Sequence, residues 1–95
     1  MIARFKATGR VQGVGYRAFA QGQARALDLA GWVRNDPDGA VSGEAEGSPE
    51  QLATYRGILR SGPPWGRVED LQWSELDGPA AGASQSLPRP FQIRR

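Results

Sequence analysis

Apolar and polar residues alternate along residues 2–8, and this two-residue period predicts a β-strand with one buried face. The side chains expected on that face are Ala3, Phe5 and Ala7. From Tyr16 onward the apolar spacing lengthens to three or four residues, which is typical of an amphipathic helix. Its apolar positions are Ala20, Ala24 and Leu27. We expect this helix to end near residues 30–31, where a glycine can terminate it.

A β-hairpin is predicted next, between a short strand at residues 31–35 and a partner strand at residues 40–47. The sequence between them, Asp-Pro-Asp-Gly at residues 36–39, consists of turn-forming residues. Small or apolar residues alternate with polar ones along the second strand, so we expect one buried and one solvated face. The buried face would carry Val41, Gly43 and Ala45, and the solvated face Ser42, Glu44 and Glu46.

A second helix should begin at Ser48, which is a good N-cap residue followed by proline, and Gln51 completes a capping box. Its apolar positions are Leu52, Tyr55 and Leu59. The helix should end at the Ser-Gly-Pro-Pro sequence of residues 61–64, because proline cannot continue a helix.

The rest of the chain predicts two more strands separated by a loop. Val68, Leu71 and Trp73 mark a fourth strand, in which Val68 is out of alternation and indicates an irregular start. Residues 77–90 are rich in Gly, Ala, Pro and Ser without periodicity, so we expect a mobile loop. The alternation resumes at Phe91 and Ile93 and predicts a short edge strand.

This order of elements predicts an α+β fold, the ferredoxin-like βαββαβ sandwich. Right-handed crossovers combined with a hairpin give an antiparallel sheet with two helices on one face, plus a short C-terminal strand. A chain of 95 residues supplies apolar material for one modest core, so we expect a single domain, residues 1–95. Because this fold serves many functions, the site has to identify the chemistry.

The composition excludes several kinds of catalytic and metal-binding groups. The chain has no cysteine and no histidine, which leaves acids, Arg, Lys, Tyr, Ser, Thr and the backbone as candidate functional groups. Eleven arginines are scattered along a chain of net charge +2, so we expect no nucleic-acid partner. We also expect no membrane anchor, a cytoplasmic location and a monomer.

The segment Thr8-Gly-Arg-Val-Gln-Gly-Val-Gly-Tyr-Arg-Ala-Phe19 leads from the first strand into the first helix and contains three glycines. Backbone N–H groups there can converge on an anion at the positive end of the helix dipole. Arg17, in the first helical turn, can bind a phosphoryl group with its planar fork. The spacing is equally compatible with a turn that only reverses the chain, since the sequence lacks the Gly-Lys-Ser/Thr of a P-loop.

Residues 9–17, Gly-Arg-Val-Gln-Gly-Val-Gly-Tyr-Arg, and residues 31–47 resemble the two signature segments of the acylphosphatase family. The resemblance extends over nearly the whole chain. It implies an enzyme that hydrolyses acyl phosphates without metal or organic cofactor. A preformed phosphoryl site should also hold inorganic phosphate or sulfate, so we expect both as competing anions. The resemblance also implies that Arg17 and Asn35 are catalytic. The phosphate-binding residues it implies are Gln12, Gly13, Val14, Gly15, Tyr16 and Arg17.

Other residues have simpler interpretations. Asp36 and Asp38 resemble the carboxylates of a magnesium-dependent phosphatase, but the intervening proline and following glycine favour a turn. Asp36 also adjoins Asn35, where a carboxylate would repel a phosphate. Glu44 and Glu46 are more typical of a solvated strand face than of an acid-base pair. We expect Trp32 and Trp73 in the core, whereas Trp65 receives no assignment.

Two functions from different classes remain. The first is a small acylphosphatase in which Asn35 orients the attacking water by its amide and the phosphoryl group is held by the loop. The second is a non-catalytic ferredoxin-like module that uses the same loop to bind an anion, as in the acylphosphatase-like domains of larger maturation proteins. The presence of both Arg17 and Asn35, in a chain of 95 residues, favours the enzyme.

Overall fold

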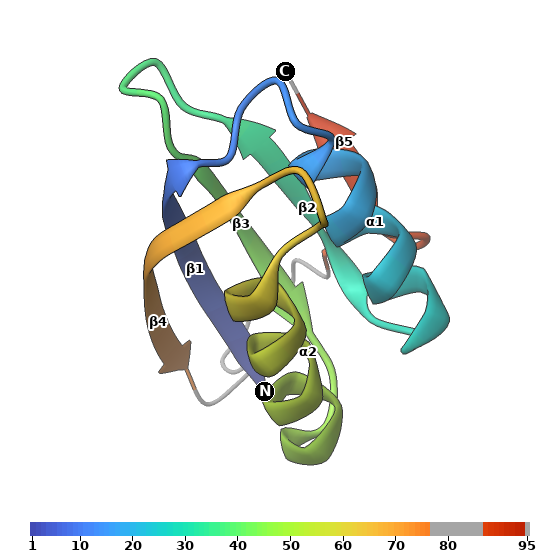
Figure 1. Cartoon of the computed structure of the whole chain (residues 1–95). Coiled ribbons are helices and arrows are strands. Elements are labelled where there is room, and N and C mark those ends of the chain that lie inside the picture. The colour runs from blue at the N-terminus through green and yellow to red at the C-terminus, as the bar shows by residue number, and fades with distance from the viewer. Residues whose placement is uncertain (77–86, 95) are drawn as a thin grey trace.

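The structure, a computed structural model, describes residues 1–76 and 87–94. Within these residues it contains five strands and two helices (Figure 1). The strands are β1 (Ile2–Arg10), β2 (Ala30–Asn35), β3 (Val41–Glu46), β4 (Arg67–Leu76) and β5 (Gln92–Arg94). The helices are α1 (Tyr16–Ala26) and α2 (Pro49–Ser61).

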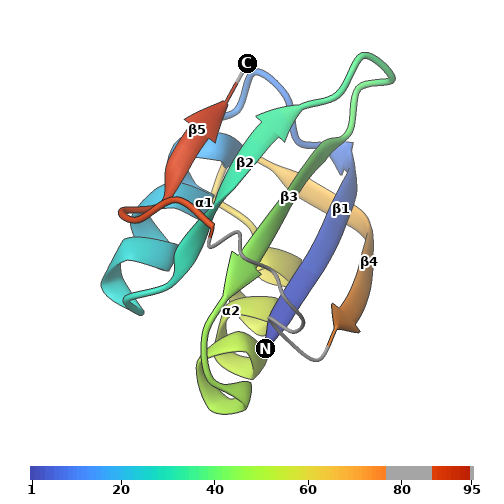
Figure 2. The same cartoon turned by 180° about the vertical axis from the view of Figure 1, so that it is seen from behind.

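The strands form one sheet in the order β4-β1-β3-β2-β5. β1 lies between β3 and β4 and is antiparallel to both, and β2 is antiparallel to β3. The predicted C-terminal strand is confirmed as an edge strand, and it runs parallel to β2, so the sheet is mixed. Both helices cover the same face, and the view from behind shows the other face of the sheet uncovered by helices (Figure 2). The predicted ferredoxin-like α+β sandwich is thereby confirmed.

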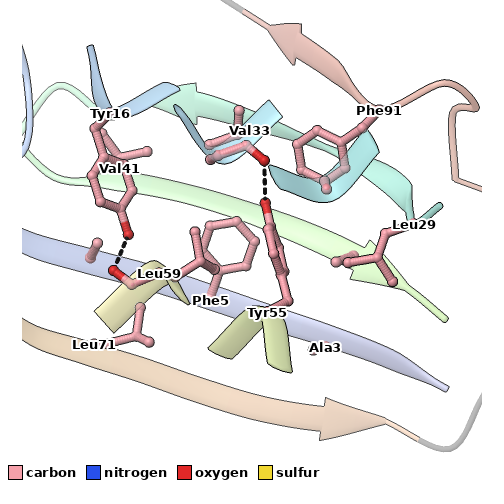
Figure 3. Packing of buried hydrophobic residues seen from close by; sticks show 14 of the residues in the cluster. Ala3, Phe5, Tyr16, Leu29, Val33, Val41, Tyr55, Leu59, Leu71 and Phe91 are labelled. Carbon is pink, nitrogen blue, oxygen red and sulfur yellow. Dashed lines mark hydrogen bonds between the residues drawn. The ribbon is translucent and has the colours of Figure 1, made fainter. Parts of the chain in front are cut away.

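The core lies between the sheet and the two helices (Figure 3). Its largest buried side chains are Tyr16, Tyr55, Phe5 and Phe91. The Tyr16 hydroxyl donates to the Leu59 carbonyl oxygen at 2.8 Å, and the Tyr55 hydroxyl donates to the Ala20 carbonyl oxygen at 2.9 Å. Each bond joins one helix to the other, so the two phenols connect the helices through the core as well as filling it.

The predicted faces and the second helix are confirmed. The buried strand residues are Ala3, Phe5 and Ala7 on β1, and Val41, Gly43 and Ala45 on β3. At the start of α2, Ser48 Oγ accepts from the Gln51 amide and Gln51 Oε1 accepts from the Ser48 amide, which is the expected capping box.

The predicted end of the first helix is wrong, because α1 ends at Ala26 and β2 has already begun at Ala30. Asp28 adopts a positive φ of 60°. The Asp28 and Leu29 amides bond back to the Arg25 and Ala24 carbonyl oxygens, as in a Schellman motif. Such a motif usually contains glycine, so the aspartate at this position did not indicate in the sequence that the helix ends there.

The first and fourth strands meet at an irregularity. β1 extends to Arg10, two residues beyond the predicted end at Thr8. Its pairing with β4 shifts there: Thr8 faces Asp70 and Gly9 faces Val68, which leaves Glu69 as the extra residue of a bulge. The broken alternation around Val68 is thereby explained.

The prediction that Trp32 and Trp73 both lie in the core is right for one of them and wrong for the other. Trp73 lies on the core side and stacks near Phe5, with ring centroids 6.3 Å apart. Trp32 was expected in the core but lies on the open face, where its indole N–H donates to Glu44 at 3.1 Å. Val33, its neighbour, is buried in the core instead. The predicted mobile loop at residues 77–90 lies largely outside the described residues.

Candidate active site

The segment between β1 and α1 has the backbone shape that the glycines predicted. Gly13 and Gly15 have φ angles of 77° and 81°, a region that side-chain-bearing residues rarely occupy. A Cβ atom added to either would meet nothing within 4 Å, so these glycines are required by conformation and not by crowding. The space beside them is therefore open to a ligand.

The helix after this loop begins without a side-chain cap. Gly15 is the N-cap of α1, and no acidic residue lies in the first turn. The first N–H groups of a helix have no partner within the helix and carry partial positive charge. Arg17 adds a full positive charge in the same turn, and it has no ion-pair partner among residues 1–76 and 87–94. An anion bound here would relieve that concentration of positive charge.

Asn35 is the last residue of β2 and lies on the same face of the sheet as the buried Val33. Its Oδ1 atom is buried and has no hydrogen-bond partner in the described part of the chain. Leaving a buried polar atom unpaired costs about 1–3 kcal/mol, so such an atom in a native protein calls for a ligand or a water as partner.

Gln12 connects the loop to the hairpin. Its side-chain Nε2 donates to the carbonyl oxygens of Asp36 at 2.8 Å and of Ala40 at 2.9 Å, at the two ends of the β2–β3 turn. The predicted contribution of Gln12 was to phosphate binding through the loop backbone. The structure gives its side chain a different task, which is to hold the loop against the turn that follows Asn35.

The Asp36 carboxylate points away from Asn35. Its Oδ1 accepts from Ser42 Oγ at 2.9 Å and from Arg34 Nε at 3.3 Å, two residues of the open face. Asp38 pairs with Lys6 at 2.9 Å, and that hydrogen bond lowers the pKa of the Asp38 carboxyl. The two aspartates thus stabilise the turn, and Asp36 is directed away from the loop.

A cleft of about 410 Å³ opens between the loop, α1, β2 and β5. Its lining residues are Val11, Gly13, Gly15, Tyr16, Arg17, Ala18, Asn35 and Ile93. The loop, the β2–β3 turn and the last described residue of β5 all lie at one end of the molecule (Figures 1 and 2). Residues far apart in the chain therefore meet in a single site.

Most of the predicted site residues are brought together. Gly13, Gly15, Tyr16, Arg17 and Asn35 all line the cleft. The Tyr16 hydroxyl, however, points into the core, where burial raises its pKa well above the ordinary range.

The side chains of two predicted site residues lie outside the cleft lining. Gln12 holds the turn, and Val14 packs against the core. The cleft residues that the sequence did not indicate are Val11, Ala18 and Ile93. Only the pairing of β5 with β2 brings Ile93 to the site.

The glycine loop, the uncapped start of α1, Arg17 and Asn35 form a candidate anion site in an α+β fold, and comparisons with known proteins identify the family of the chain. The acylphosphatase family model matches residues 3–84. An acylphosphatase of Salinibacter ruber is 46% identical over 90 residues, which cover 93% of this chain and 86% of the relative.

Solved structures agree with this match. The crystal structure of acylphosphatase from Bacillus subtilis superposes with a TM-score of 0.88 at 35% identity over the whole of both chains. Full-length HypF, in a phosphate- and nucleotide-bound crystal structure, matches with a TM-score of 0.78 at 26% identity, and the match covers 12% of that chain. The protein belongs to the acylphosphatase family, whose reaction is the hydrolysis of acyl phosphates.

Proposed function

We propose that the cleft binds the phosphoryl group of an acyl phosphate and hydrolyses its bond to the acyl oxygen. The loop amides of residues 12–17 surround the phosphoryl oxygens, and the Arg17 guanidinium donates to them in a bidentate manner. Asn35 orients the attacking water through Oδ1. The observation that carries this assignment is the buried, unpartnered Oδ1 of Asn35 in the same cleft as Arg17.

The proposed step needs little from the protein beyond placement and charge. The water oxygen attacks phosphorus, and the bond between phosphorus and the acyl oxygen breaks with its electron pair leaving on the carboxylate. The proton of the water passes to a phosphoryl oxygen, so the products are a carboxylate and inorganic phosphate. The carboxylate is a good leaving group and the transition state is loose, so positioning and charge stabilisation suffice without a basic side chain.

We also propose the domain organisation, the substrate class, the location and the oligomeric state. Residues 1–95 act as one acylphosphatase-like domain, with a small-molecule substrate and no nucleic-acid partner. The described part of the chain has no helix long and apolar enough to cross a membrane. A cytoplasmic, monomeric enzyme fits the absence of cysteine and the size of the chain.

The experiment that tests the proposal is hydrolysis of benzoyl phosphate in the presence of inorganic phosphate or sulfate. A preformed anion site predicts turnover with competitive inhibition by either anion. Turnover with noncompetitive inhibition would place the anion outside the catalytic cleft. Binding of phosphate without turnover would favour the alternative function, an anion-binding module.

A further inference from the structure

Three large hydrophobic side chains are exposed among the described residues: Trp65, Leu76 and Ile93. Ile93 is 37% exposed, and it is the one of the three that lines the active-site cleft. Exposing an isoleucine to water within a binding cleft forgoes the free energy of its burial. Such a side chain gains that free energy back when an apolar part of a ligand covers it.

The pairing of β5 with β2 explains how Ile93 reaches the cleft. Ile93 pairs in parallel register with Val33, a core residue, so both side chains lie on the helix-covered face. Asn35 lies two residues further along β2 on that same face. β5 therefore adds an apolar wall beside the strand that presents the polar Asn35.

The residues that line the cleft are of two kinds, polar and apolar. The loop glycines, Arg17 and Asn35 supply its polar groups, whereas Ile93 and Ala18 supply apolar surface from β5 and the first turn of α1. A volume of about 410 Å³ lies within the range of small-molecule sites and accommodates more than a phosphoryl group. The polar lining residues account for the phosphoryl group, and the apolar lining residues leave surface for an apolar part of the substrate.

We propose that Ile93 contacts the acyl group of the substrate and makes the enzyme prefer acyl phosphates with a bulky apolar acyl group. This inference rests on the proposed binding of the phosphoryl group in the cleft. In-line attack places the leaving oxygen opposite the water held by Asn35. The bond angle at that oxygen turns the acyl group off the line of attack, which brings the acyl carbons within reach of a side wall such as the one formed by Ile93.

The kinetic test compares benzoyl phosphate with acetyl phosphate, which share the phosphoryl group and differ in apolar surface. We expect Ile93→Ala to lower kcat/KM for benzoyl phosphate about tenfold and to change that for acetyl phosphate less than about twofold. Ile93→Val should recover most of the loss. Leu76→Ala is the matched control, because Leu76 is also exposed but pairs with Ile2 at the opposite end of the sheet.

Two outcomes would overturn the proposal. Equal losses for both substrates would mean that Ile93 supports Asn35 or the phosphoryl site and does not contact the acyl group. Unchanged kinetics for both would mean that the acyl group points elsewhere. Since Ile93 is partly exposed, the variants should fold, and their thermal midpoints check this.

A binding experiment separates this proposal from the proposed function. Phenacylphosphonate and acetonylphosphonate carry a methylene in place of the bridging oxygen and cannot be hydrolysed at that bond. We expect the parent protein to bind the phenyl compound more tightly, and Ile93→Ala to reduce the ratio of the two affinities about tenfold. An unchanged ratio contradicts the acyl contact. If the parent hydrolyses neither acyl phosphate, the proposed function fails, and the affinity ratio still decides the role of Ile93.

Discussion

The core and the candidate active-site cleft differ in whether their buried polar atoms have hydrogen-bond partners. In the core, the hydroxyls of Tyr16 and Tyr55 each donate to a carbonyl oxygen of the facing helix. In the cleft, Asn35 Oδ1 is buried without a partner, and Arg17 has no ion-pair partner in the described part of the chain. The core satisfies its polar groups internally and gains stability, whereas the cleft leaves hydrogen-bonding capacity for a ligand. Substitutions in the two regions should therefore affect different properties.

The largest effect is expected from Arg17→Lys, in the cleft. Lysine keeps the charge but loses the planar pair of donors, so activity should fall by about 10²–10³ if the contact is strongest in the transition state. The free energy of unfolding should change by less than about 0.5 kcal/mol, since Arg17 makes no structural ion pair. Steady-state kinetics and urea unfolding of the same variant measure both quantities. Activity near that of the parent would assign the role to charge alone or to Arg10, because Arg34 is already bonded to Asp36 on the open face.

Asn35→Ala should separate turnover from binding. We expect kcat to fall about 10²-fold while the inhibition constant of inorganic phosphate moves less than about threefold. Stability should be preserved, because the removed oxygen has no partner to lose. A residue that serves only the turn would instead cost about 1 kcal/mol of stability at unchanged kcat. Kinetics, phosphate inhibition and the thermal midpoint, measured on one preparation, distinguish the two roles.

Gln12→Ala should lower both activity and stability, because Gln12 joins the loop to the turn without facing the cleft. Losing its two hydrogen bonds should lower kcat about tenfold and the free energy of unfolding by about 1–2 kcal/mol. Gln12→Glu keeps the shape but directs a carboxylate at the Asp36 and Ala40 carbonyl oxygens, so it should be no better than alanine. If kcat is unchanged in both variants, the placement of Asn35 does not depend on this connection.

Tyr16→Phe should affect the core alone, although Tyr16 is next to Arg17 in the chain. The variant loses the hydroxyl that bonds to Leu59 O, which should cost about 1 kcal/mol of stability. Because that hydroxyl points away from the cleft, kcat should remain within about twofold of the parent value. A large loss of kcat at small loss of stability would show that the phenol contributes to catalysis.

Chelation should have the smallest effect. The proposed mechanism stabilises phosphoryl charge with backbone amides and Arg17, so treatment with EDTA should leave kcat unchanged. Loss of activity on chelation, with recovery on addition of magnesium, would contradict the mechanism. The phosphate inhibition constant, measured before and after treatment, serves as the control for an intact anion site.

Local signals in the sequence predicted most of the elements but not all of their ends. The capping box at Ser48 and the broken alternation at Val68 both correspond to features of the structure. The end of α1 was missed because Asp28 occupies a position that usually requires glycine. Trp32 was assigned to the core because alternation states which residues share a face and leaves open which face is buried.

The sequence by itself determined the order of the elements, the glycine-rich loop before a helix, and the resemblance that singles out Arg17 and Asn35. The first two properties depend on neighbouring residues, through periodicity, capping and turn preference, whereas the third is a match of sequence motifs. The tertiary structure decided which distant groups meet. Strand order brings Ile93 into the cleft, and the Gln12 side chain holds the loop against the turn. The hydrogen bond from Ser42 directs the Asp36 carboxylate away from Asn35. Contacts of this kind follow from sheet pairing and register, which arise from packing of the whole chain and leave no local mark on the residues involved.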